Sequence, residues 1–168
     1  MNCRHIAALL ALALAVALPA LAQPVPEPTP DYDPTMAEVR TYPLTMDKVE
    51  KLTAAIDALS RLEAADPALK AKMDAEPSDD PTVDEKVQSL DTRFPEAANV
   101  VHQNGLTSRD YIIVSLAFLN DVAFVAMKRQ GAIQSYPPGA ITPQNAAFVE
   151  ANYDMLERLS EKISGSSN

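Results

Sequence analysis

The most apolar stretch after the first 22 residues reads TSRDYIIVSLAFLNDVAFVAMKRQG, from Thr107 to Gly131. Thr107 is suited to cap a helix, and Asp110 stands three residues later, at the spacing of a capping box. Gly131 follows Lys128 and Arg129, which is the order typical of a helix C-terminus. Apolar residues occupy nearly every side of this predicted helix, so we expect it to lie at the centre of a helical bundle.

Two other long helices are predicted to pack around this centre. One begins after Thr45 and the other at Thr142-Pro143, and both repeat apolar residues every three or four positions. The first stripe is Met46, Val49, Leu52, Ile56, Leu59 and Leu62, and the second is Ala146, Val149, Tyr153, Leu156, Leu159 and Ile163.

Shorter helices are predicted in the middle of the chain, each with its own start signal. Asp66-Pro67 and Phe94-Pro95 place proline at a first helical position, and Thr82-x-x-Glu85 is a capping box. Residues 76–81 contain two prolines and three acids and are predicted to form a loop. Period-two alternation is scarce, so no strand is predicted. The expected fold class is all-α: a small helical bundle of three long helices plus two or three short ones, over residues 44–164, with a tail at 165–168.

The N-terminus has the three-part layout of a secretory signal peptide. A short basic start is followed by an apolar run from Ile6 to Leu18, and Ala20-Leu21-Ala22 gives an Ala-x-Ala cleavage pattern. We therefore expect residues 1–22 to be removed on export, with no membrane span left afterwards. The periplasm is the expected location, and the extracellular space is the alternative.

A proline-rich stretch follows the predicted cleavage site. Prolines recur at every second position from Pro24 to Pro30. Such a sequence favours an extended, semi-rigid chain with few backbone donors. Residues 23–43 are therefore predicted to be an extended linker that precedes the bundle.

Composition narrows the classes of function. Cys3 is the only cysteine and lies within the predicted signal peptide, so a mature chain of 146 residues would contain no disulfide, thiolate nucleophile or cysteine-held metal. Removal of Arg4 takes the formal charge from −9 to −10, which disfavours nucleic acid as a partner. No cofactor and no metal site are predicted.

Four residues are candidates for a ligand site: His102, Arg109, Asn120 and Asp121. His102 is the one histidine left after cleavage, and it falls at a helix C-terminus. Arg109 stands at a helix start, where a small anion could bind. Asn120 and Asp121 interrupt the most apolar helix, and a buried amide needs hydrogen-bond partners.

Each candidate also has a purely structural interpretation. On that view, Asp121 belongs with Asp110 and Lys128 to a narrow strip that faces solvent, while Asn120 bonds a neighbouring backbone group. This interpretation is favoured over a pocket, because natural cores often contain one satisfied polar group.

The acidic residues and the methionines suggest metal or haem binding only weakly. Two acidic clusters lack the spacing of an EF-hand loop, and solvated charge is the preferred interpretation. These are Asp79, Asp80, Asp84 and Glu85, and the pair Asp31 and Asp33. Haem ligation would need His102 together with one of the mature methionines, which are Met36, Met46, Met73, Met127 and Met155.

The sequence therefore predicts an exported, acidic, non-catalytic binding module that contacts an unknown envelope protein or a small ligand, as a monomer or a homodimer. Two alternatives stay open. One is a metal- or haem-binding carrier. The other is a hydrolase or lyase that uses His102 with Asp110 or Asp121.

Overall fold

The computed structural model describes residues 34–75 and 82–165, and all its regular structure there is helical. The predicted all-α bundle is confirmed. The predicted signal peptide, residues 23–33 of the predicted linker, the predicted 76–81 loop and residues 166–168 of the tail lie outside the described residues. The helices are α1 (Pro34–Thr41), α2 (Met46–Ala65), α3 (Pro67–Asp74), α4 (Val83–Arg93), α5 (Pro95–Gln103), α6 (Ser108–Arg129), α7 (Pro143–Ala151) and α8 (Tyr153–Gly165).

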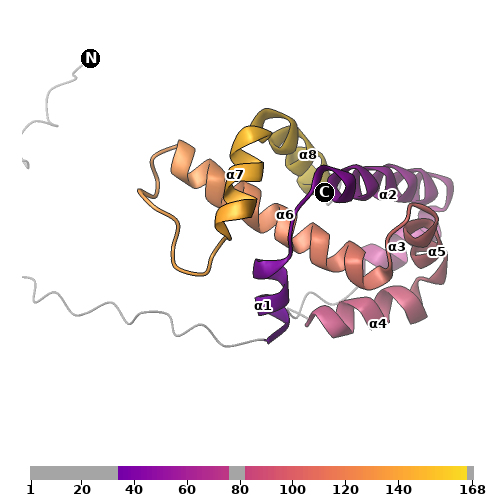
Figure 1. Cartoon of the computed structure of the whole chain (residues 1–168). Helices are drawn as coiled ribbons and strands as arrows, with labels where there is room; N and C mark the ends of the chain where they lie inside the picture. The colour runs from indigo at the N-terminus through magenta and orange to yellow at the C-terminus, as the bar shows by residue number, and fades with distance from the viewer. Residues whose placement is uncertain (1–33, 76–81, 166–168) are drawn as a thin grey trace, which may run out of the picture. The chain divides into compact units, whose positions relative to one another are not determined.

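Helix α6 is the centre of the bundle, as its apolar circumference predicts. It packs against α1, α2, α4, α5, α7 and α8, while α3 packs on α2. Figure 1 shows α6 between α4 on one side and α2 and α8 on the other. Val114, Ala117, Phe118 and Val125 of α6 are fully buried. In the described part of the chain α6 is also the one helix long and apolar enough to cross a membrane, a test that the core helix of a soluble bundle passes equally.

Both ends of α6 have the predicted caps. Thr107 accepts a bond from the Asp110 amide at 3.0 Å, and the Asp110 carboxylate accepts one from the Thr107 amide, which completes the capping box. At the other end Gly131 has a φ of 76°, and the Ala132 amide donates to the Met127 carbonyl at 2.9 Å. This is a Schellman motif, which glycine forms without strain.

The starts of the shorter helices are also confirmed. The Asp66 carboxylate accepts bonds from the Ala68 and Leu69 amides at 3.0 Å each. Thr82 and Glu85 form the predicted capping box of α4. These signals are local in sequence, so the sequence alone is enough to find them.

The predicted boundary between linker and bundle is wrong. Helix α1 occupies Pro34–Thr41, inside the stretch predicted to be extended, and it packs on α4 and α6. Proline is accepted in the first helical turn, and no further proline follows before Pro43. Val39 and Leu44 are only 1% and 2% exposed, so burial of these side chains holds the segment in the fold.

The predicted C-terminal long helix is divided in two at Asn152. The amide of Asn152 donates to Val149 O at 3.2 Å, and its side chain donates to Phe148 O at 2.8 Å. A side chain that bonds the preceding turn competes with continuation of the helix. The apolar spacing continues unchanged from Val149 to Tyr153 and Leu156, so it does not indicate a helix break at Asn152.

Candidate functional site

Asn120 and Asp121 lie together in a buried polar network that joins α6 to α7. Asp121 is fully buried, and it accepts bonds from Asn120 Nδ2 at 3.0 Å and from Asn145 Nδ2 at 2.7 Å. Asn145, also fully buried, accepts from the Leu44 amide at 3.1 Å and donates to the Tyr42 carbonyl at 2.8 Å. We call Asn120, Asp121 and Asn145 the Asp121 clip, because they fasten the chain before α2 to the core.

The amide orientations in the Asp121 clip follow from its backbone partners. A backbone N–H only donates and a backbone carbonyl only accepts, so the Leu44 amide and the Tyr42 carbonyl fix the side chain of Asn145. Asn120 Nδ2 also donates to the Ala140 carbonyl at 2.9 Å. Both asparagines therefore present N–H groups to Asp121, whose two oxygens are the acceptors.

Two opposing effects act on the pKa of the Asp121 carboxyl group. Burial raises its pKa above the usual aspartate value, and the bonds from Asn120 and Asn145 oppose that rise. The prediction that Asp121 faces solvent is wrong, because the helix it sits on is surrounded by other helices. The prediction that Asn120 bonds a neighbouring backbone group is confirmed by its contact with Ala140.

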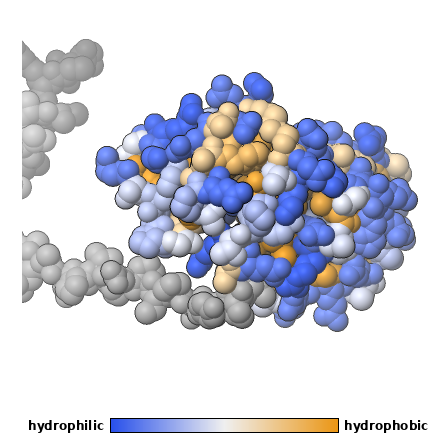
Figure 2. All heavy atoms as spheres, viewed as in Figure 1, coloured by the Kyte–Doolittle hydropathy of each residue, from blue (hydrophilic) through white to orange (hydrophobic). Residues whose placement is uncertain are grey.

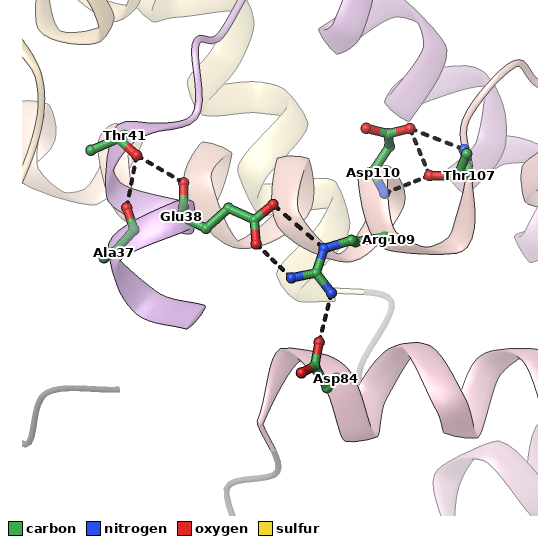
Figure 3. Close-up of polar contacts among 7 residues, drawn as sticks. All are labelled: Ala37, Glu38, Thr41, Asp84, Thr107, Arg109 and Asp110. Carbon is green, nitrogen blue, oxygen red and sulfur yellow. Dashed lines mark hydrogen bonds and ion pairs between the residues drawn. The ribbon is translucent and has the colours of Figure 1, made fainter. Parts of the chain in front are cut away.

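Arg109 joins three helices at the surface, as Figure 3 shows. Its Nη2 lies 2.6 Å from Glu38 Oε2 of α1, and its Nη1 lies 2.6 Å from Asp84 Oδ1 of α4. Because the Arg109 side chain is 43% exposed, solvent screens these pairs and they add little stability. Two carboxylates already occupy the positions on Arg109 that a small anion would use.

His102 contacts neither of the acids considered for it from the sequence. Its Nε2 lies 3.1 Å from Ser108 Oγ, and the Ser108 hydroxyl donates to Asp91 Oδ1. Asp110 bonds Thr107 and Tyr42 instead, and the Thr107 hydroxyl holds the pKa of Asp110 below its usual range.

The His102–Ser108–Asp91 chain has the wrong order for nucleophilic catalysis. In a serine nucleophile site the histidine stands between the acid and the serine. Here Ser108 stands in the middle, donates a hydrogen bond to Asp91, and is only 3% exposed. The three side chains tie α4, α5 and α6 together at a point that the sequence does not reveal, because Asp91 and Ser108 are 17 residues apart.

An apolar groove lies between α2 and α8, and sequence reasoning did not find it. Its volume is about 420 Å³, and its lining is Met46, Val49, Glu50, Thr53, Ala54, Asp57, Met155 and Leu159. The Thr53 hydroxyl donates to the Val49 carbonyl at 2.7 Å, so its proton is not free for a ligand. Met155 is 40% exposed, which is high for a large apolar side chain in this fold. We call this surface the α2–α8 groove.

A second hollow, of about 450 Å³, lies at the bend between α7 and α8 and shares Met155 with the α2–α8 groove. Two arginines and two acids line it, namely Arg129, Arg158, Glu150 and Asp154. The Arg129 guanidinium stacks on the Tyr153 ring, with its Cζ 4.1 Å from the ring centroid. Figure 2 shows hydrophobic residues gathered at the surface over α7 and the start of α8, within a largely hydrophilic surface.

Neither acidic cluster is assembled as a metal site among the residues that the structure describes. No group of three histidine, cysteine or acidic side chains there could hold a metal ion. Asp84 pairs with Arg109, and Glu85 caps α4. Asp31, Asp33, Asp79 and Asp80 lie outside the described residues.

The methionines considered for haem have other surroundings. Met46 and Met155 line the α2–α8 groove, and Met36 and Met73 pack on the core. Met127 is 40% exposed on α6.

Comparisons with protein-family models, with curated proteins and with solved structures find no match for this chain.

Proposed function

We propose that this protein is exported and acts as a non-catalytic binding module of the cell envelope, with the α2–α8 groove as its contact surface. The signal-peptide pattern of residues 1–22 supports export. The groove supports binding, because it presents apolar side chains to solvent between two helices.

The proposal rests on a contrast between the four candidate residues, whose side chains bond other parts of the fold, and the groove, which is open to solvent. Asn120 and Asp121 bond Asn145 and backbone groups, Arg109 bonds two acids, and His102 bonds a buried serine. These contacts all join parts of the fold to one another. The apolar side chains that line the groove include Met155, which stays 40% exposed, so a second molecule that covers them gains from desolvation.

Export is tested by locating and sequencing the protein in its own cells. We expect a C-terminally tagged chain to fractionate with the periplasm or the medium and to begin at Gln23. A cytoplasmic protein that retains Met1 would contradict the proposal. A variant with Leu10→Arg and Leu12→Arg in the apolar run is the control, and it should stay in the cytoplasm with residues 1–22 attached.

Binding at the groove is tested by site-specific photo-crosslinking in living cells. A photoreactive residue at Ala54 lies in the groove, and the same residue at Ala123 lies on the exposed face of α6. We expect an adduct of defined mass from position 54 and not from position 123. The same adducts from both positions, or none from position 54, would count against a binding role for the groove.

A further inference from the structure

We propose, on the basis of the binding function above, that the α2–α8 groove accepts a basic amphipathic helix of a partner protein. Such a helix has apolar residues on one face, which fill the groove. Lysine or arginine residues beside them meet the acidic side chains at its edge.

The groove lies between two helices, α2 and α8, which form its two walls. Both α2 and α8 pack closely on α6, but they are not closely packed on each other. An ion pair between Lys162 of α8 and Asp57 of α2 spans the seam at one point. A surface of this kind matches the helix-in-groove mode of recognition, in which apolar anchors three or four residues apart enter a groove.

The lining of the groove favours apolar anchors. Its lining includes Met46, Val49 and Leu159, and the hydroxyl proton of Thr53 is already donated to a backbone carbonyl. A polar side chain placed against these three apolar residues would lose its water without gaining a partner. The methionine side chains are unbranched and adapt to differently shaped apolar anchors.

The rim of the groove favours a basic partner. Its charged lining residues are Glu50 and Asp57; Asp57 already pairs with Lys162, which leaves Glu50 to meet a lysine or arginine of the partner. Glu50 forms no ion pair with any described residue. The whole chain has a formal charge of −9, so a second copy would bring like charge, whereas a basic helix would be attracted.

The test measures binding of two labelled 18-residue peptides to the purified protein by fluorescence anisotropy. One peptide is an amphipathic helix of leucine and lysine, and the other has glutamate in place of every lysine. We expect the basic peptide to bind and the acidic one not to. Affinity for the basic peptide should fall at least about tenfold in Ala54→Arg and several-fold in Met155→Gln.

Met127→Gln is the matched control. Met127 and Met155 are each 40% exposed, but Met127 lies on α6 and does not line the groove, so its change should leave the affinity unaltered. Glu50→Gln should weaken binding at low salt and reduce its salt dependence, because it removes a rim charge. Circular dichroism of each variant confirms that a lost affinity is not a lost fold.

Other outcomes overturn the proposal. Equal binding of both peptides, no binding of either, or unchanged affinity in Ala54→Arg would exclude a basic helix at this groove. A dimer in sedimentation that Ala54→Arg dissociates would identify a second copy as the occupant. If the position-54 adduct persists in cells while the basic peptide does not bind, the binding function stands and the partner class is wrong.

Discussion

The Asp121 clip depends on a carboxylate that accepts two hydrogen bonds. Asn120 and Asn145 both present N–H groups to Asp121, and their other partners fix them in that orientation. In Asp121→Asn the new amide can accept from only one of them and brings a donor against the other. We expect the free energy of unfolding to fall by about 2–4 kcal/mol, since a buried donor loses its partner. Urea denaturation at neutral pH measures this.

An exposed acid provides the control for the same chemical change. Glu161 of α8 is exposed and stands outside the clip, so Glu161→Gln should change the free energy of unfolding by less than about 0.5 kcal/mol. Equal losses in the two variants, or no loss in Asp121→Asn, would show that the clip does not stabilise the fold.

The sequence alone reveals part of this clip. Asn120 and Asp121 stand out as polar residues in the most apolar helix, and that signal is sound. Asn145 gives no such signal, because an asparagine in a first helical turn is ordinary at an exposed position. Asp121 and Asn145 stand 24 positions apart and are brought together by packing of α6 on α7, which no local pattern records. The contact of His102 with Ser108, and that of Ser108 with Asp91, are likewise made by tertiary packing and leave no local sequence signal.

At the element scale, the Schellman motif after α6 makes Gly131 a position where a side chain costs conformational energy. Its φ is 76°, and an added Cβ would meet no atom within 4 Å. Gly131→Ala should therefore lower the free energy of unfolding by about 1 kcal/mol through backbone strain alone. Gly131→Asn should cost less, because asparagine tolerates the left-handed region. Thermal unfolding of the two variants checks the order, and an alanine variant as stable as the wild type contradicts it.

Helix boundaries can be predicted where the signal lies in a few neighbouring residues. They cannot be predicted where tertiary packing determines whether a helix forms or ends. The ends of α6 follow from Thr107 and Gly131, each acting on its own turn. Helix α1 was missed because the prolines before it dominate the composition, although burial of Val39 stabilises a helix there. The break at Asn152 was missed because the apolar spacing continues through it.

At the scale of the whole molecule, the carboxyl groups determine how stability changes in acid. The pKa values of Asp110, Glu85 and Glu150 are lowered, chiefly by bonds from the Thr107 hydroxyl, the Thr82 amide and the Lys128 ammonium. Their stabilisation is present above the unfolded-state values of about 4 and is lost as the pH falls through the lower folded-state values. Asp121 acts in the opposite direction: its raised pKa gives stability below about 4 that is lost as the pH rises through the folded-state value.

The three lowered groups outnumber the raised one, so we expect net destabilisation between about pH 5 and pH 2. Urea midpoints measured across this range give the slope directly. Asp110→Asn should make the decline shallower, because it removes one of the three groups. A protein that gains stability towards pH 3 would show that Asp121 outweighs the others.

The bond from the Leu44 amide to Asn145 joins positions 101 residues apart, and this separation has a consequence in time. A loop that long closes late, after the local helices have formed. Under the proposed export, a chain that crosses the membrane unfolded with its N-terminus leading exposes Leu44 on the far side long before Asn145. Until α7 emerges, Val39 and Leu44 have no finished core to enter. Val39 and Leu44 would therefore cross early and be buried late, and a chaperone that holds unfolded chains would find exposed apolar residues there.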